Sequence, residues 1–184
     1  METEQRIPDE ITQRLPRVGR PLPDFRLTDT AGGEVRLGGF RQRQPVLLAF
    51  PHGPGCAACA AWLGALVGAR AAFDEQNAAV LIVVPGSPEA ARDLRSRLDL
   101  PFRVLADAAG QTTAEFVPAV GATGGQAPVA LYAADRYGYC LARWLADDAT
   151  GLPSPEVALV PIRDAEQEDC GCGLPAWPVE EVQP

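Results

Sequence analysis

The sequence predicts an α/β protein, in which a mixed β-sheet starts with a hairpin and is flanked by helices. The first observation is Val46–Phe50, a continuous apolar run with Pro45 before it and the Pro51–Gly55 segment after it, as is typical of a buried central strand. The second is Val80–Val84, a similar apolar run. Helical patterns follow both runs, so strand and helix alternate, which predicts a layered arrangement.

Helical patterns separate the predicted strands. Apolar residues at intervals of three and four predict one helix over residues 57–76. Ser87–Glu89 places an N-cap residue, a first-turn proline and an early acid in order, so a second helix should start there. Ser154–Glu156 repeats this pattern, and Pro161 should break or kink the helix that it starts.

The remaining strands are predicted from alternation and from turn residues. Phe25 and Leu27 alternate with polar residues, a DTAGGE turn follows, and Val35 and Leu37 alternate again, which predicts the N-terminal hairpin. Later in the chain, the pattern predicts a short strand over residues 102–105, a brief helix over 112–117, and an antiparallel pair of strands over 129–133 and 139–145.

The chain has 184 residues, a length that favours one domain. Residues 1–17 carry mixed charge and prolines without periodicity, and we interpret them as an N-terminal lead-in. Residues 18–168 form the predicted domain. Residues 169–184 form a Pro-rich tail that contains cysteines.

The composition excludes several kinds of catalytic site. All 16 basic residues are arginine, which excludes sites that need a lysine amine, such as a P-loop or a pyridoxal Schiff base. His52 is the single histidine, which excludes metal centres built on several imidazoles. The nucleophile or ligand that remains is chiefly sulfur, and we expect no cofactor and no resident metal.

The charge of the chain indicates which partners to exclude. The formal net charge is −8 and no basic run is present, so we expect neither a nucleic-acid partner nor an anionic membrane surface. The longest apolar run is far shorter than the roughly 20 residues that span a bilayer. Residues 1–10 lack the basic start and apolar centre of a signal peptide. A reducing cytoplasm is the predicted compartment.

A C-x-x-C motif carries the main chemical signal. Cys56 and Cys59 lie where the buried strand is followed by a helix, so the Cys56 sulfur should lie near unpaired backbone N–H groups that favour the thiolate. Cys59, one turn later, should be more buried and keep its proton. Two core cysteines, or half of a metal site, are the alternatives. Two core cysteines would not need Pro54 and Gly55, which bring the backbone to the surface.

The tail holds a second pair of cysteines, Cys170 and Cys172. Acidic residues precede them and disfavour their thiolates, so both sulfurs should attack poorly. Three roles stay open for this pair. It is an auxiliary dithiol that reduces the Cys56 disulfide, or a pair of ligands that completes a four-sulfur zinc site with Cys56 and Cys59, or an inert part of the tail.

The stretch VLLAFPHGPGCAACAAWL resembles the strand, active-site loop and helix of the thioredoxin fold, and more closely the redoxin or alkyl hydroperoxide reductase-like branch of the peroxiredoxin superfamily. Val18-Gly19 with Pro23–Phe25, LPFRVLAD, and the AP dipeptide followed by VALYAADRYGY extend the resemblance over about residues 18 to 145. It implies a thioredoxin-like sheet, and it implies that Pro128 is a cis-proline lying against the active-site disulfide. His52 supports the site in this interpretation or is a solvated loop residue.

The chain departs from this family at positions that bind peroxide. Peroxiredoxins carry Thr or Ser three residues before the reactive cysteine, where this chain has Gly53, and they place an Arg where this chain has Gln126–Pro128. It also departs from thioredoxins, which carry Trp at the position of Gly55 and Gly-Pro between the cysteines. These departures favour thiol exchange over peroxide reduction.

Three functions therefore remain. The first is a thiol-disulfide oxidoreductase in which Cys56 attacks a protein or small-molecule disulfide and Cys59 resolves the mixed disulfide. The second is a thiol peroxidase that reduces hydroperoxides through a sulfenic acid on Cys56. The third is a non-catalytic metal-binding or interaction module. The sequence does not indicate which partner supplies the reducing electrons.

Overall fold

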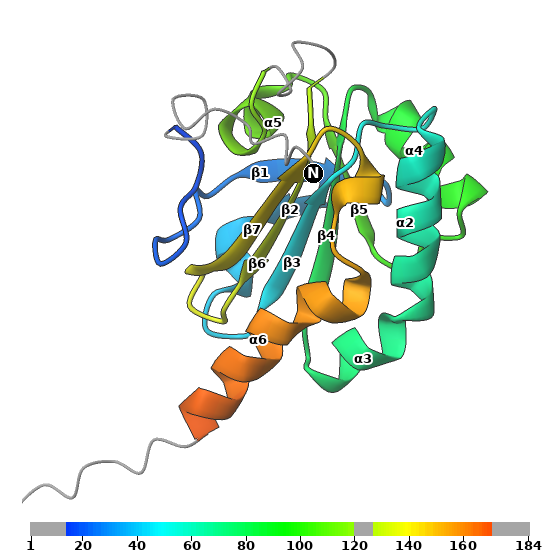
Figure 1. Ribbon diagram of the computed structural model, residues 1–184. Coiled ribbons are helices and arrows are strands. Elements are labelled where there is room, and N and C mark those ends of the chain that lie inside the picture. Colours follow the sequence, from blue (N-terminus) through cyan, green and yellow to red (C-terminus); the bar gives the residue numbers. More distant parts are fainter. Residues whose placement is uncertain (1–13, 120–126, 171–184) are drawn as a thin grey trace, which may run out of the picture.

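The computed structural model describes residues 14–119 and 127–170, and its centre is one mixed β-sheet (Figure 1). Within these residues the sheet has seven strands in the order β2-β1-β5-β4-β3-β6-β7. The strands are β1 (Arg26–Asp29), β2 (Glu34–Arg36), β3 (Val46–Phe50), β4 (Ala79–Pro85), β5 (Arg103–Asp107), β6 (Val129–Ala134) and β7 (Cys140–Ala146).

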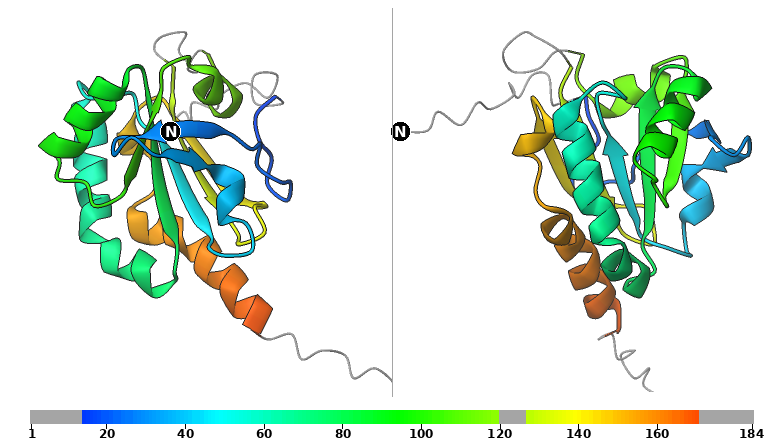
Figure 2. Two further views of the ribbon diagram at one scale, coloured as in Figure 1. Left: turned by 180° about the vertical axis from the view of Figure 1, so that it is seen from behind. Right: turned by 90° about the vertical axis from the view of Figure 1, so that its right-hand side faces the viewer.

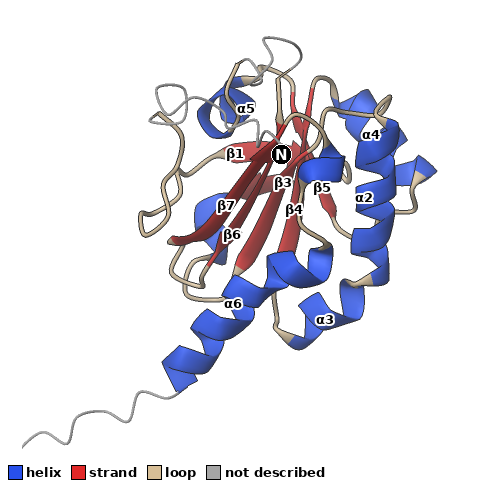
Figure 3. Ribbon diagram, viewed as in Figure 1, coloured by secondary structure: helices blue, strands red, loops and turns tan. Residues whose placement is uncertain are grey.

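Helices lie beside this sheet, as the secondary-structure colours of Figure 3 show. They are η1 (Leu37–Phe40), α2 (Ala57–Gly68), α3 (Arg70–Glu75), α4 (Pro88–Arg97), α5 (Gln111–Phe116), η2 (Ala149–Gly151) and α6 (Pro155–Cys170). The mixed sheet flanked by helices is the predicted fold class.

The pairing of the strands sets where the candidate site lies. β3, β4 and β5 are parallel neighbours, whereas β6 pairs with both β3 and β7 in antiparallel fashion. The predicted N-terminal hairpin is confirmed, with Leu27 opposite Val35. Parallel strands end at the same edge of a sheet, and this edge is where α/β proteins bind ligands. The loop after β3 leaves the sheet at this edge.

Two apolar clusters cover the two faces of the sheet. One is formed by α2, α4 and α6 against inward residues of the central strands, and the other by the N-terminal segment, η1 and α5. The view in Figure 2 from the side shows α2 and α6 together on one side of the strands. All five residues of β3 are buried, as its unbroken apolar run predicts. β3 is therefore a rigid support for the loop that follows it.

Two predictions about helices are corrected. The single helix predicted over residues 57–76 is two helices, because α2 ends at Gly68, a poor helix former, and Ala69 leaves helical geometry with ψ of 1°. The predicted apolar face is nevertheless buried along both helices. The break predicted at Pro161 is absent, because α6 continues through it. Ala158 and Ile162 on either side are fully buried, and their packing offsets the backbone hydrogen bond that proline cannot donate.

The end of the N-terminal segment runs along the start of β7. The Gly19 N–H donates to the Cys140 carbonyl at 2.8 Å, and the Cys140 N–H donates to the Arg20 carbonyl at 2.9 Å. Cys140 itself is buried and packs as a small apolar residue. These bonds close part of the outer edge of the sheet.

Candidate active site

The Cys56 sulfur lies at the start of α2, where the loop after β3 becomes helical. Cys56 is the N-cap residue of this helix, and its Sγ accepts a hydrogen bond from the Cys59 N–H at 3.1 Å. The first N–H groups of a helix have no partner within the helix and carry partial positive charge. The Cys56 sulfur therefore lies beside the N-terminal N–H groups of α2, the position that the sequence predicted for it. The Cys56 side chain is half-buried and reaches the surface.

The Cys59 sulfur lies one helical turn deeper. The residue is 1% exposed, and its side chain packs in the larger apolar cluster. Burial is the largest cause that raises the pKa of the Cys59 thiol to about 12, and the adjacent Cys56 sulfur raises it further, whereas a hydrogen bond from the His52 backbone lowers it. Cys59 is therefore a protonated thiol at neutral pH. The predicted contrast between an accessible and a buried cysteine is confirmed.

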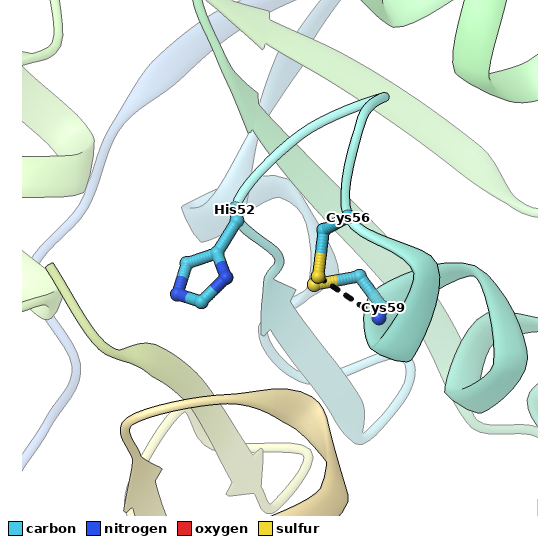
Figure 4. A group of neighbouring side chains, drawn as sticks. All are labelled: His52, Cys56 and Cys59. Atoms are coloured by element: carbon cyan, nitrogen blue, oxygen red, sulfur yellow. Dashed lines mark hydrogen bonds between the residues drawn. The ribbon is translucent and has the colours of Figure 1, made fainter. Parts of the chain in front are cut away.

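The His52 side chain turns toward the two sulfurs (Figure 4). One ring nitrogen and the sulfurs of Cys56 and Cys59 all lie within 4.8 Å of one another. The Nε2 atom is fully buried and has no hydrogen-bond partner among the described residues. His52 is partly buried, with one ring nitrogen beside the two sulfurs and the other buried. Val46–Phe50 is anchored in the sheet, and the loop that follows it folds back so that this ring lies inside the site.

An open cavity of about 410 Å³ gives access to Cys56. Besides His52 and Cys56, its lining includes two carboxylates, Asp147 and Asp148, from the segment between β7 and η2. Hydrogen bonds from the Thr150 side chain and backbone lower the pKa of Asp148, and its electrostatic interaction with His52 lowers it further. The residues that line the cavity include no arginine, serine or threonine. The mouth of the site is therefore acidic.

The loop between β3 and Cys56 has an unusual backbone. Gly53 has a φ of +124°, which side-chain-bearing residues rarely adopt, and its carbonyl accepts the Cys56 N–H at 3.3 Å. The Pro54 carbonyl accepts a hydrogen bond from the Arg97 guanidinium of α4. The loop is therefore fastened at both ends of its turn, and Gly55 completes the connection to α2.

The start of β6 lies beside Cys59. Val129 and Ala130 line a small apolar cavity together with Cys59 and Trp62, and the Trp62 indole donates to the Pro153 carbonyl at 2.8 Å. Pro128 is buried directly before these residues. The prediction that it is a cis-proline is wrong, because no peptide bond in the described part of the chain is cis. No residue pattern in the sequence distinguishes a cis from a trans proline, so that expectation rested on the family resemblance alone.

Some of the residues singled out from the sequence lie outside the described part of the chain. The side chain of Cys170 and all of Cys172 lie outside the described residues, as does the glycine-rich stretch 121–126. Conversely, the sequence analysis missed Asp147, Asp148 and Arg97. A pair of acids or a helix arginine is common on protein surfaces, so only the fold reveals that these three side chains lie at or beside the loop of Cys56.

Comparison with known proteins gives one family match and many structural matches. The model of the AhpC/TSA family matches residues 18–131, a stretch that includes both cysteines and Pro128. A comparison with curated protein sequences gave no match. No helix in the described part of the chain is long and apolar enough to cross a membrane.

Three solved structures illustrate the structural likeness. The reduced 2-Cys peroxiredoxin of Plasmodium vivax is 22% identical with a TM-score of 0.70, covering 85% of this chain and 84% of its own. The peroxidoxin BcpB of Mycobacterium tuberculosis is 20% identical with a TM-score of 0.68, covering 81% and 97%. A candidate thiol:disulfide interchange protein, DsbE, of Chlorobium tepidum is 20% identical with a TM-score of 0.60, covering 85% and 97%. At these identities the likeness establishes the fold.

Proposed function

The chain belongs to the AhpC/TSA family of thioredoxin-like thiol oxidoreductases and peroxidases, and from this premise we propose that it is a thiol-disulfide oxidoreductase that uses Cys56 and Cys59. The observation that carries the proposal is the asymmetry of the two sulfurs. Cys56 lies at a helix N-terminus and opens to a cavity, whereas Cys59 is 1% exposed and lies one turn behind it.

The first step is attack on a partner disulfide. The Cys56 thiolate attacks one sulfur of the partner disulfide. A Cys56–partner disulfide forms, the S–S bond of the partner breaks, and its other sulfur leaves as a thiolate. The Cys59 N–H that donates to Sγ of Cys56 holds the attacking sulfur in place. The open cavity in front of Cys56 gives the partner disulfide room to approach in line.

The second step is resolution by Cys59. Once Cys56 is in a mixed disulfide it carries no negative charge, so its contribution to the high pKa of Cys59 disappears, while the helpful hydrogen bond from the His52 backbone remains. A His52 ring nitrogen lies within 4.8 Å of both sulfurs, and in this scheme it moves into hydrogen-bond distance to accept the Cys59 proton and pass it to the leaving thiolate. The products are the Cys56–Cys59 disulfide and a reduced partner.

The test of this function traps the intermediate. Cys59→Ser should accumulate a mixed disulfide through Cys56, Cys56→Ser should form none, and Cys140→Ala should behave as the wild type because that sulfur is buried at the outer edge of the sheet. Reduction of a model protein disulfide should be lost in both active-site variants. Equal activity in wild type, Cys56→Ser and Cys59→Ser would contradict the proposal.

The donor of the electrons that return the Cys56–Cys59 disulfide to the dithiol belongs to the same proposal. The tail pair Cys170 and Cys172 acts as an auxiliary dithiol in this scheme, and a reducing cytoplasm supplies its electrons. With a monothiol such as glutathione as electron donor, wild type should turn over repeatedly, whereas a Cys170→Ser/Cys172→Ser variant should complete one turnover and stop, unless a small dithiol is added. Continued turnover without such an addition would show that another reductant reaches Cys56 directly.

Peroxide reduction is a second candidate, favoured by the family match and by the peroxiredoxins among the structural neighbours. In this reaction Cys56 cleaves the O–O bond and becomes a sulfenic acid, and Cys59 condenses with it to release water. The cavity lining offers neither hydroxyl nor guanidinium to polarise a peroxide, and two carboxylates stand there instead. We therefore expect peroxide consumption no faster than that by free cysteine, measured with stopped-flow mixing.

A further inference from the structure

The Cys56, Cys59 and His52 side chains form a compact set of metal-ligating atoms. Their two sulfurs and one ring nitrogen lie within 4.8 Å of one another. In a tetrahedral zinc site with ordinary bond lengths, donor atoms are separated by about 3.5 to 3.8 Å. The three donors therefore need to approach by about 1.3 Å at most, a movement that side-chain rotation can supply. The donors come from two adjacent structural pieces, the loop after β3 and the first turn of α2.

Three further observations point to a cation at this place. Two thiolates and an imidazole match the ligand set of open zinc sites, in which a fourth position is left to an exchangeable ligand. Both His52 and Cys56 line the cavity of about 410 Å³, so the fourth position faces open space, and Cys59 closes the rear. Asp147 and Asp148 line the same cavity, so the field there attracts positive ions.

The orientation of the His52 ring fits a ligand of this site. Its Nε2 atom is fully buried and has no hydrogen-bond partner in the described part of the chain. Buried polar atoms are nearly always paired, and an exception indicates a catalytic role or an absent water or ion. In Figure 4 the ring nitrogen next to the side-chain attachment, Nδ1, faces the sulfurs, and Nε2 points away from them, so Nδ1 is the nitrogen placed to bind a cation.

We propose that His52, Cys56 and Cys59 of the reduced protein form a three-ligand site for a thiophilic cation such as Zn²⁺, with its fourth position open to the cavity. Binding transfers no electrons: two S–H bonds are replaced by two S–Zn bonds, and two protons, less any already lost from Cys56, pass to solvent. The disulfide form has no thiolate to offer and does not bind. The cation and the partner disulfide therefore compete for Cys56, so the metal holds the dithiol reduced and masked.

The experiment titrates Zn²⁺ into the full chain, reduced and freed of reductant under anaerobic conditions, against a chromogenic chelator. Wild type should bind one Zn²⁺ per chain, and His52→Ala should weaken the affinity at least about tenfold. Cys56→Ser and Cys59→Ser should abolish stoichiometric binding. Two matched controls, Cys140→Ala and Cys170→Ser/Cys172→Ser, should bind as wild type does. Protein oxidised to the Cys56–Cys59 disulfide should bind none.

A second readout follows the reactivity of Cys56 without any turnover. One equivalent of Zn²⁺ should slow the alkylation of Cys56 by iodoacetamide at least about tenfold in wild type and by a smaller factor in His52→Ala at the same metal concentration. Equal Zn²⁺ affinity in wild type and His52→Ala, or loss of binding in the tail variant, would overturn the assigned ligand set. Disulfide exchange by the metal-free protein tests the proposed function separately, so one proposal can fail while the other stands.

Discussion

The buried Cys59 thiol should react slowly with alkylating reagents because its pKa is high, and not only because it is buried. Its pKa of about 12, against an ordinary value of 9.0, means that at pH 8 about one molecule in ten thousand carries the thiolate. An ordinary cysteine would carry it in about one molecule in ten. Because the thiolate is the nucleophile, Cys59 in the reduced, metal-free protein should react with iodoacetamide about a thousandfold more slowly than in the unfolded chain.

The assay maps the sites of modification by mass spectrometry at low conversion, over a range of pH. The alkylation rate at Cys59 should rise about tenfold per pH unit up to at least pH 10, and it should reach the rate of an ordinary cysteine when urea unfolds the chain. A purely steric block would make the rate level off near pH 9, where an ordinary thiol is half ionised. Such levelling, or a folded-state rate close to the unfolded one, would refute the order of attack and resolution that we assign.

Three other predictions test the support of the site and its surroundings. Tyr132 is fully buried and its hydroxyl donates to the Phe116 carbonyl at 2.5 Å, so Tyr132→Phe leaves a buried acceptor unpaired and should lower the free energy of unfolding in urea by about 1 to 3 kcal/mol; the exposed Tyr139→Phe should change it by less than about 0.5 kcal/mol. At Asp24 partial burial acts against the carboxylate, but the Gly38 N–H and the Arg36 guanidinium outweigh it and hold its pKa below the usual 3.8, so its stabilisation is present above about pH 4 and is lost as pH falls through the lowered value. Asp24→Asn should therefore be less stable than wild type at pH 7, and the difference should shrink in acid; a difference independent of pH would contradict the assignment. Finally, removing the two carboxylates at the cavity with Asp147→Asn/Asp148→Asn should raise the rate with anionic glutathione disulfide relative to cationic cystamine by about two- to fivefold at low salt, whereas Asp164→Asn on α6 should leave the ratio unchanged.

The sequence predicted those features that local pattern determines. A five-residue apolar run bounded by prolines has few alternatives to a buried central strand, and β3 has the predicted limits. Ser87 caps α4 by accepting the Ala90 N–H, in keeping with the local Ser-Pro-Glu pattern. The position of Cys56 at the start of a helix follows from the same kind of reasoning. The apolar run of β3 and the apolar face of α2 fix where the strand ends and the helix begins, and Cys56 lies at the end of the short loop between them.

Features that depend on tertiary packing escaped the sequence analysis. The direction of the His52 ring depends on how the loop folds back from β3, and a single polar residue between prolines carries no signal for it. Asp147 and Asp148 reach the cavity only because β7 pairs with β6 and its following segment packs on α2 through η2. The end of α2 at Gly68 left the predicted apolar face intact, because burial of that face depends on spacing more than on helical continuity.

Gly53 limits how the chemistry of this protein can change by mutation. A β-branched residue at φ of +124° strains the backbone by an amount of order 1 to 3 kcal/mol, although an added Cβ would meet no other atom within 4 Å. Replacing Gly53 by threonine would thus add a hydroxyl three residues before Cys56 while bending the loop that aims it. The conformation of this one glycine therefore keeps a hydroxyl from being added there without displacing the loop that carries Cys56.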